Sequence, residues 1–200
     1  MIKKYTVSII LALVFITAGC SDFGKVDQGR VVAYDKEQKI VTIIKDKSVD
    51  PKKPDYSVLP PVTYKMPDDP GETGPEPKAG YRMKLDLEKK QVVIFMPKIN
   101  NFVTVGYNLI EQKEVAQNDP LIFDKETNKQ KKFPVIDQQN RTISIYSKRQ
   151  KTYVVISVSD DYFALPPETW DSGDEVRIYY KEPGKALRFM NISKTDIFKK

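Results

Sequence analysis

The hydrophobic residues of this chain fall in short runs that alternate with polar residues and are separated by polar turns. A two-residue period is typical of β-strands with one buried face, and helical periodicity is weak along the chain. Three segments share one arrangement, in which an Asp opens a tight turn and a β-branched residue follows six positions later. Such an Asp can accept hydrogen bonds from the backbone N–H groups of the turn. These segments predict hairpins at GRVVAYDKEQKIVTII (29–44), KLDLEKKQVVIF (84–95) and VIDQQNRTISIY (135–146), with turns at Asp35, Asp86 and Asp137.

A second pattern, D-Y-x-x-L-P-P-x-T-aromatic, occurs twice, as DYSVLPPVTY (55–64) and DYFALPPETW (161–170). Each copy follows a predicted hairpin and precedes another, which Gly80 or Gly173 opens. The proline pairs favour an extended corner, because proline lacks an N–H and restricts the residue before it. PPETW also fits the start of one short helical turn. The matching order predicts two tandem units of similar design.

The first twenty residues, MIKKYTVSIILALVFITAGC, form a separate segment. Two lysines precede an apolar run over 7–17, which is shorter than the roughly 20 residues that span a bilayer. Small residues then precede Cys20, and the segment resembles the lipobox of bacterial lipoproteins. That resemblance implies cleavage before Cys20 and anchoring to membrane lipid through acyl chains such as palmitate, each buried CH₂ contributing roughly 0.8 kcal/mol. The alternative is an ordinary signal peptide that leaves a free cysteine.

The expected fold is all-β, with two small antiparallel β-barrel-like units. Two segments near the C-terminus together resemble the closing hairpin of small OB-like or SH3-like barrels. They are SGDEVRIYY and GKALRFMNIS. Alternation on this hairpin places Val176 and Ile178 inward, with Leu187 and Phe189 returning inward. The expected organisation is a signal peptide (1–19), a lipidated tether (20–28), a first β-unit (29–110), a linker or extra hairpin (111–132) and a second β-unit (133–200).

Composition excludes several classes of chemistry. The chain has no histidine and one cysteine, so it lacks the base of Ser-His-Asp and Cys-His systems, the ligands of a His/Cys zinc site and the thiolates of an iron–sulfur cluster. We expect no cofactor. The net charge is +6, or +4 without the two leader lysines, and charges of both signs alternate along the chain. A nucleic-acid surface shows a one-sided basic stripe instead, so no nucleic-acid partner is expected.

Acidic residues are the next candidates for chemistry. The segment 65–80 is rich in proline and acids and predicts a long exposed loop, without the spacing of an EF-hand calcium site. Asp160 and Asp161 are adjacent, and neighbouring residues of a strand face opposite sides, so they do not predict a catalytic pair. Asp161 is expected to cap the turn that follows. We therefore predict no catalytic residue and no metal site; the acids considered in the loop are Asp68, Asp69, Glu72 and Glu76.

Aromatic residues cluster toward the C-terminus. Stacked aromatic side chains hold sugars or bases on OB-like sheets, and they also build the cores of small barrels. Tyr56 and Tyr64 repeat at equivalent places in the first unit, which favours a structural role. The possible ligand face consists of Tyr162, Phe163, Trp170, Tyr179 and Tyr180.

The chain from about Asp22 to Lys200 resembles an uncharacterised family of bacterial lipoproteins. The segments that carry this resemblance are SVLPPVTY, YSKRQK and RFMNISKTDIF. That resemblance implies a location and no activity. The expected function is a membrane-anchored, non-enzymatic binding or assembly module for another envelope protein or a glycan. The alternatives are a glycan- or peptidoglycan-binding module and a carboxylate-based hydrolase. Ser21 after the lipidated cysteine resembles an outer-membrane address, facing the periplasm or the cell surface if the cell is Gram-negative.

Overall fold

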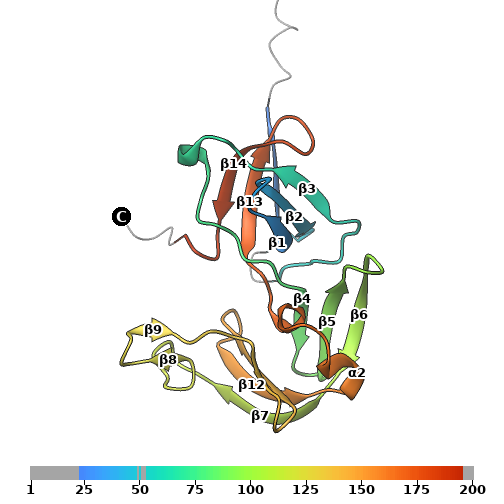
Figure 1. Ribbon diagram of the computed structural model, residues 1–200, viewed down its shortest axis with the longest axis vertical. Helices are drawn as coiled ribbons and strands as arrows, with labels where there is room; N and C mark the ends of the chain where they lie inside the picture. The colour runs from blue at the N-terminus through green and yellow to red at the C-terminus, as the bar shows by residue number, and fades with distance from the viewer. Residues whose placement is uncertain (1–22, 49, 51–52, 196–200) are drawn as a thin grey trace, which may run out of the picture.

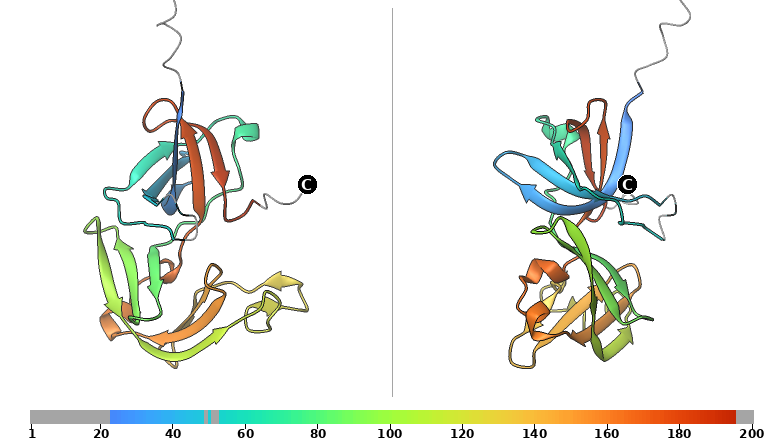
Figure 2. Two further views of the ribbon diagram at one scale, coloured as in Figure 1. Left: turned by 180° about the vertical axis from the view of Figure 1, so that it is seen from behind. Right: turned by 90° about the vertical axis from the view of Figure 1, so that its right-hand side faces the viewer.

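The computed structural model describes residues 23–48, 50 and 53–195. The predicted signal peptide and the predicted lipidation site Cys20 lie outside the described residues. The described chain forms two lobes, one above the other in Figure 1 and separate again in both views of Figure 2. Within the described ranges, no helix is long and apolar enough to cross a membrane.

The upper lobe is one antiparallel sheet with the strand order β14-β13-β1-β2-β3. It unites the two ends of the described chain, because β1 pairs with β13 from Lys25↔Tyr180 to Arg30↔Glu175. A short 3-10 helix, η1 (Pro70–Glu72), lies in the loop after β3. The strands are β1 (Lys25–Asp35), β2 (Ile40–Lys45), β3 (Val62–Lys65), β13 (Glu175–Tyr180) and β14 (Ala186–Asn191).

The lower lobe contains a three-stranded sheet, β4-β5-β6, and a four-stranded sheet, β10-β11-β12-β7. Buried apolar side chains of both sheets form one core, to which α2 (Asp160–Phe163) and η2 (Pro167–Trp170) contribute Phe163 and Trp170. A small hairpin, β8-β9, extends from this lobe (Figure 1). The strands are β4 (Arg82–Asp86), β5 (Gln91–Met96), β6 (Asn101–Gly106), β7 (Asn108–Glu114), β8 (Phe123–Asp124), β9 (Lys129–Gln130), β10 (Val135–Asp137), β11 (Thr142–Ser147) and β12 (Thr152–Ser157).

The all-β fold class is confirmed, but the strands pair across the expected units 29–110 and 133–200. β1 pairs with β13, and β7 pairs with β12, so each lobe takes strands from both. In the sequence, the strands of the lower lobe (β4–β12) come between the two parts of the upper lobe, β1–β3 and β13–β14. The sheets are open rather than closed barrels. The expected tether 20–28 also ends early, because β1 begins at Lys25, and the segment 111–132 contains the end of β7 and the β8-β9 hairpin.

The hairpin turns follow one local design. Six hairpins have a four-residue loop whose last residue has a positive φ between 48° and 54°. In the three predicted hairpins the Asp before the loop accepts a backbone N–H three residues on, at 2.9 Å in each case. These contacts confirm the structural role predicted for the three aspartates. The residues with positive φ are Lys39, Lys90, Asn100, Asn128, Arg141 and Lys151.

A lysine at such a position is strained, because the left-handed conformation brings the Cβ atom of a non-glycine residue close to the following carbonyl oxygen. Replacing Lys90 (φ 51°) with glycine is expected to raise the free energy of unfolding by about 0.5–1 kcal/mol. Urea denaturation measures this change. Lys89→Gly, one position earlier in the same loop, is the matched control and is expected to destabilise, since it adds only backbone entropy. A decrease for both variants would contradict the prediction.

The repeated ten-residue pattern takes two different structures. The first copy is extended and ends in β3, whose Tyr64 is paired with Val41 of β2. The second copy forms α2 and η2, and η2 is the short helical turn that PPETW predicts. Ser159 precedes α2 at the N-cap position, so Asp161 lies within the helix instead of capping a turn. The sequence repeat is therefore not a repeat of local structure.

The chain passes between the lobes twice, and the two connections meet at Gly80 and Gly173. The Gly80 N–H donates to the Val31 carbonyl at 3.1 Å, and the Val31 N–H donates to the Asp174 carbonyl at 2.9 Å. A Cβ atom on Gly80 would lie 2.3 Å from the Gly173 nitrogen. The glycines predicted to open closing hairpins thus allow two backbone segments to touch. A third apolar cluster, which includes Val32, Ile44, Tyr56, Met83 and Phe95, joins the lobes beside this crossing.

Candidate functional site

The five aromatic residues predicted as a ligand face lie in two separate places. Phe163 and Trp170 are buried in the core of the lower lobe, and Tyr162 packs against them. Tyr179 and Tyr180 are on β13 in the upper lobe, where the Tyr180 ring lies 5.3 Å from that of Tyr64. These side chains do not form one exposed surface. The ring clusters contribute to packing in both lobes.

Five of the six acidic residues considered as candidates contact basic side chains or the backbone. Glu72 forms an ion pair with Arg188, and Asp69 accepts the Gly71 N–H at 2.8 Å. Asp160 pairs with Arg141 at 2.6 Å. Across the part of the chain that is described, no group of three or more His, Cys, Asp or Glu residues is arranged to hold a metal ion.

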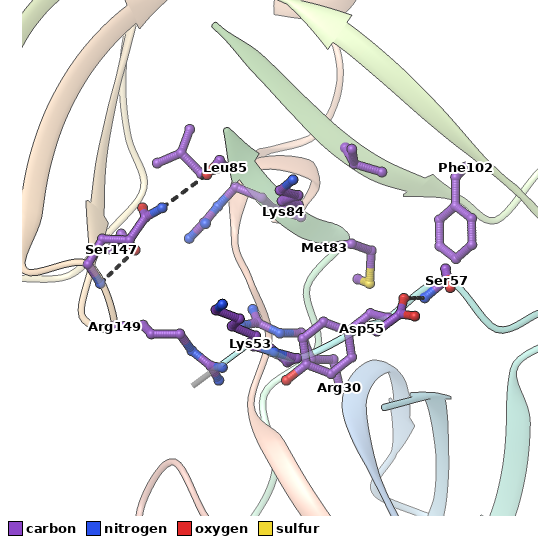
Figure 3. A pocket seen from close by; sticks show the side chains of 15 residues that line it. Arg30, Lys53, Asp55, Ser57, Met83, Lys84, Leu85, Phe102, Ser147 and Arg149 are labelled. Atoms are coloured by element: carbon purple, nitrogen blue, oxygen red, sulfur yellow. Dashed lines mark hydrogen bonds between the residues drawn. The ribbon is translucent and has the colours of Figure 1, made fainter. Parts of the chain in front are cut away.

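A cavity of roughly 700 Å³ lies between the lobes. Strand β1 and the segment before β3 line it from the upper lobe, while β4, β5, β6 and the β11-β12 turn line it from the lower lobe (Figure 3). We call this cavity the interlobe cleft. Its polar side is formed chiefly by Arg30, Arg82 and Arg149, and its apolar side by Met83, Leu85, Val93 and Phe102.

Arg82 is the most deeply placed cation of the cleft, with 8% of its surface exposed. It is the first residue of β4, and a register shift follows it, so Arg82 and Met83 are both buried although they are adjacent. The Arg82 Nε–H donates to the Trp170 carbonyl at 2.9 Å. This bond fixes the guanidinium at the wall of the cleft.

Arg30 reaches the same place from β1. Its Nη1 group donates to the Ser172 carbonyl at 3.1 Å, and its guanidinium carbon lies 4.6 Å from the centre of the Tyr56 ring. This is a cation–π contact, which orients the guanidinium plane. Figure 3 shows Arg149 extending toward Arg30, with Met83 and Phe102 on the other side of the cavity.

Two of the five basic residues that line the cleft, Lys84 and Arg149, have an acidic partner. Arg149 pairs with Glu175 at 2.9 Å, and Lys84 pairs with Asp86 at 3.0 Å. Asp171, which lies near the arginines, pairs with Lys78. Arg30 and Arg82 are different, because no carboxylate of the described residues lies within 4.0 Å of either guanidinium.

Burial, and then the positive charge of Arg30, lower the pKa of Arg82 to about 10. The negative charge of Asp171 raises the pKa of Arg82, but by less. The guanidinium therefore remains charged at neutral pH, but its charge is poorly compensated. Burial also raises the pKa of the Tyr56 hydroxyl above its ordinary value, so this hydroxyl keeps its proton.

Two buried polar atoms at the cleft lack a hydrogen-bond partner, the Arg30 Nε and the Tyr56 hydroxyl. Buried polar groups in folded proteins are nearly always paired, and an unpaired one costs about 1–3 kcal/mol. A functional role or a bound ion is among the explanations for such a group in a native structure. The arrangement can bind a group that accepts hydrogen bonds and carries negative charge.

Sequence reasoning did not find this cleft. Arg30 and Arg82 stand in ordinary strand patterns, GRVVAY and GYRMKLD, among alternating charges. The one signal is residue type, since arginine is preferred to lysine where a cation is buried. This preference does not predict which arginines lie close together in the folded protein.

The fold and the cleft define a two-lobed, all-β protein with a cluster of arginines between its lobes. A family model described as "Domain of unknown function (DUF4881)" matches residues 22–200, and the chain belongs to that family. The expectation that the body belongs to an uncharacterised family is thereby confirmed. No curated protein and no solved structure matches the chain.

Proposed function

We propose that this chain is a lipoprotein of the bacterial cell envelope whose body is a non-enzymatic binding module. The interlobe cleft is the observation that carries the binding role. It combines a buried guanidinium, that of Arg82, and a half-buried one, that of Arg30, neither with an acidic partner among the described residues, with an apolar wall. Ligand sites commonly place a few polar groups in a concave, mostly apolar cavity. The described residues that line it include Asp55 as the one acid.

The location is supported by the leader sequence MIKKYTVSIILALVFITAGC. Lys25, where β1 begins, follows Cys20 by five positions, and an extended chain spans at most about 18 Å over five positions. Acylation of Cys20 would therefore hold the upper lobe close to the membrane surface. Outer-membrane placement, with the body in the periplasm or at the cell surface, accords with Ser21 after the cysteine.

Cys20→Ala tests the anchor. We expect the wild type in the membrane fraction of its own cells, labelled by a clickable palmitate analogue, and we expect the variant in the soluble fraction without label. The physical reason is the loss of two or three acyl chains, each of which contributes roughly 0.8 kcal/mol per buried CH₂. Ser21→Ala is the matched control and should stay in the membrane. A membrane-bound, unlabelled Cys20→Ala variant would refute the lipoprotein assignment.

The binding role is tested in the same cells by crosslinking, followed by mass spectrometry. We expect the wild type to carry a specific partner molecule that an Arg30→Gln variant loses while it stays anchored. An identical crosslinking pattern for the two proteins would place any binding outside the cleft.

A further inference from the structure

We propose that the interlobe cleft binds a small amphipathic anion, whose carboxylate or phosphate group is held by Arg30 and Arg82 while its apolar part lies against Met83, Val93 and Phe102. This inference rests on the proposed binding function and names the class of ligand. Both acid groups present the same chemistry to a guanidinium, which can donate two parallel N–H bonds to either.

The charge balance of the cleft favours an anion. Arg82 is 8% exposed, and neither Arg30 nor Arg82 has a carboxylate within 4.0 Å among the described residues. Removing a cation from water is costly unless a negative group and hydrogen bonds compensate it. Two further cations at the cleft, Arg149 and Lys84, have Glu175 and Asp86 as partners. An anion placed between Arg30 and Arg82 would compensate the charges of both guanidiniums.

Hydrogen bonding leads to the same conclusion. The protein uses one N–H of Arg82, to the Trp170 carbonyl, and one of Arg30, to the Ser172 carbonyl. Among the described residues, the buried Nε of Arg30 has no acceptor. The Tyr56 hydroxyl beside Arg30 is buried without a partner. An oxyanion supplies several acceptor lone pairs at once, whereas an alcohol or a neutral amide supplies fewer and no charge.

The apolar wall distinguishes an amphipathic anion from a bare one. Met83 is 6% exposed and belongs to the cluster that joins the lobes, against which Val93 and Phe102 pack. The cavity of roughly 700 Å³ is within the range of about 300–1,000 Å³ that is typical of sites for organic ligands. An inorganic ion would leave the apolar side without contact.

The test uses residues 21–200, which contain every described strand and core, so the anchor is not needed for the contacts that form the cleft. Isothermal calorimetry below micelle concentrations compares decanoate, decyl phosphate, decanol and acetate. We expect decanoate or decyl phosphate, or both, to bind at one site, with affinity at least about 10-fold above that of decanol and acetate, as expected for charge-assisted hydrogen bonds. Which of the two acids binds more tightly identifies the acid group.

Two variants assign the binding to the cleft. Arg30→Gln and Arg82→Met are each expected to weaken binding about 10-fold or more. Arg188→Gln, in an arginine that pairs with Glu72 away from the cleft, is the matched control and should bind like the wild type. Circular dichroism checks that each variant is folded. Arg30 is less buried than Arg82, so Arg30→Gln is expected to fold even if Arg82→Met does not. The test can then rest on Arg30→Gln alone.

Three results would overturn the ligand assignment: no binding of either acid by the folded protein, equal binding of decanol, or equal binding by Arg30→Gln and the wild type. These results are separable from failure of the proposed function. The behaviour of Cys20→Ala and the crosslinking pattern in cells do not depend on which small anion binds.

Discussion

Replacing Gly80 with alanine is expected to lower the free energy of unfolding by about 2–4 kcal/mol, a large effect for the addition of one methyl group. The new Cβ atom would lie 2.3 Å from the Gly173 nitrogen and 2.6 Å from the Asp171 carbonyl oxygen. These are backbone atoms of the second connection between the lobes, so they cannot rotate away. The two connections would have to separate. That would weaken two backbone hydrogen bonds, from the Gly80 N–H to the Val31 carbonyl and from the Arg82 N–H to the Asp171 carbonyl, the latter 2.8 Å long.

Gly106→Ala is the matched control for this prediction. Gly106 ends β6, and a Cβ atom there would meet nothing within 4 Å, so we expect a change within about 0.5 kcal/mol. Urea denaturation followed by circular dichroism measures both variants. Because Arg82 follows Gly80 by two residues, Gly80→Ala should also weaken binding of an anion at the cleft. Similar stabilities for the two variants would show that the crossing is not close-packed.

The hairpins could be predicted from the sequence because their determinants are local. Asp35, Asp86 and Asp137 each cap a turn within three residues. The alternation of Val176 and Ile178 likewise places both in the core. Leu187 was expected inward but is 40% exposed, because a register shift between Tyr179 and Tyr180 changes the phase of β14. Leu187, between the paired Ala186 and Arg188, is the extra residue of this irregularity and so falls outside the alternation.

The pairing of the strands could not be predicted in this way. Val26 lies opposite Tyr179 in the upper sheet. The local sequence around a strand does not identify a pairing strand that is more than a hundred residues away. The matching phrases instead suggested two consecutive units. Contacts of such sequence separation also determine the site, since Arg30 and Arg82 come from different lobes. The aromatic residues were conspicuous in the sequence, yet the structure uses Phe163 and Trp170 for packing.

Trp170→Ala is expected to reduce the free energy of unfolding by about 3–5 kcal/mol, the usual cost of emptying a fully buried aromatic site. Trp170 has no exposed surface and lies in the core that both sheets of the lower lobe share. Its indole N–H has no partner, so Trp170→Phe, which removes that group and keeps a ring, should cost less. Thermal and urea denaturation compare the two variants.

The same residue distinguishes packing from ligand binding. Trp170 is the only tryptophan of the chain, so its fluorescence reports this site alone. We expect blue-shifted emission, resistant to iodide and unchanged by soluble glycans, because the ring is enclosed by protein. Tyr179→Ala, in one of the two partly exposed tyrosines on β13, should destabilise far less. Ready quenching by iodide, or a stable Trp170→Ala variant that loses glycan binding, would restore the aromatic ligand face. Retained burial would leave the interlobe arginines as the stronger candidate, because they combine buried charge with an accessible cavity.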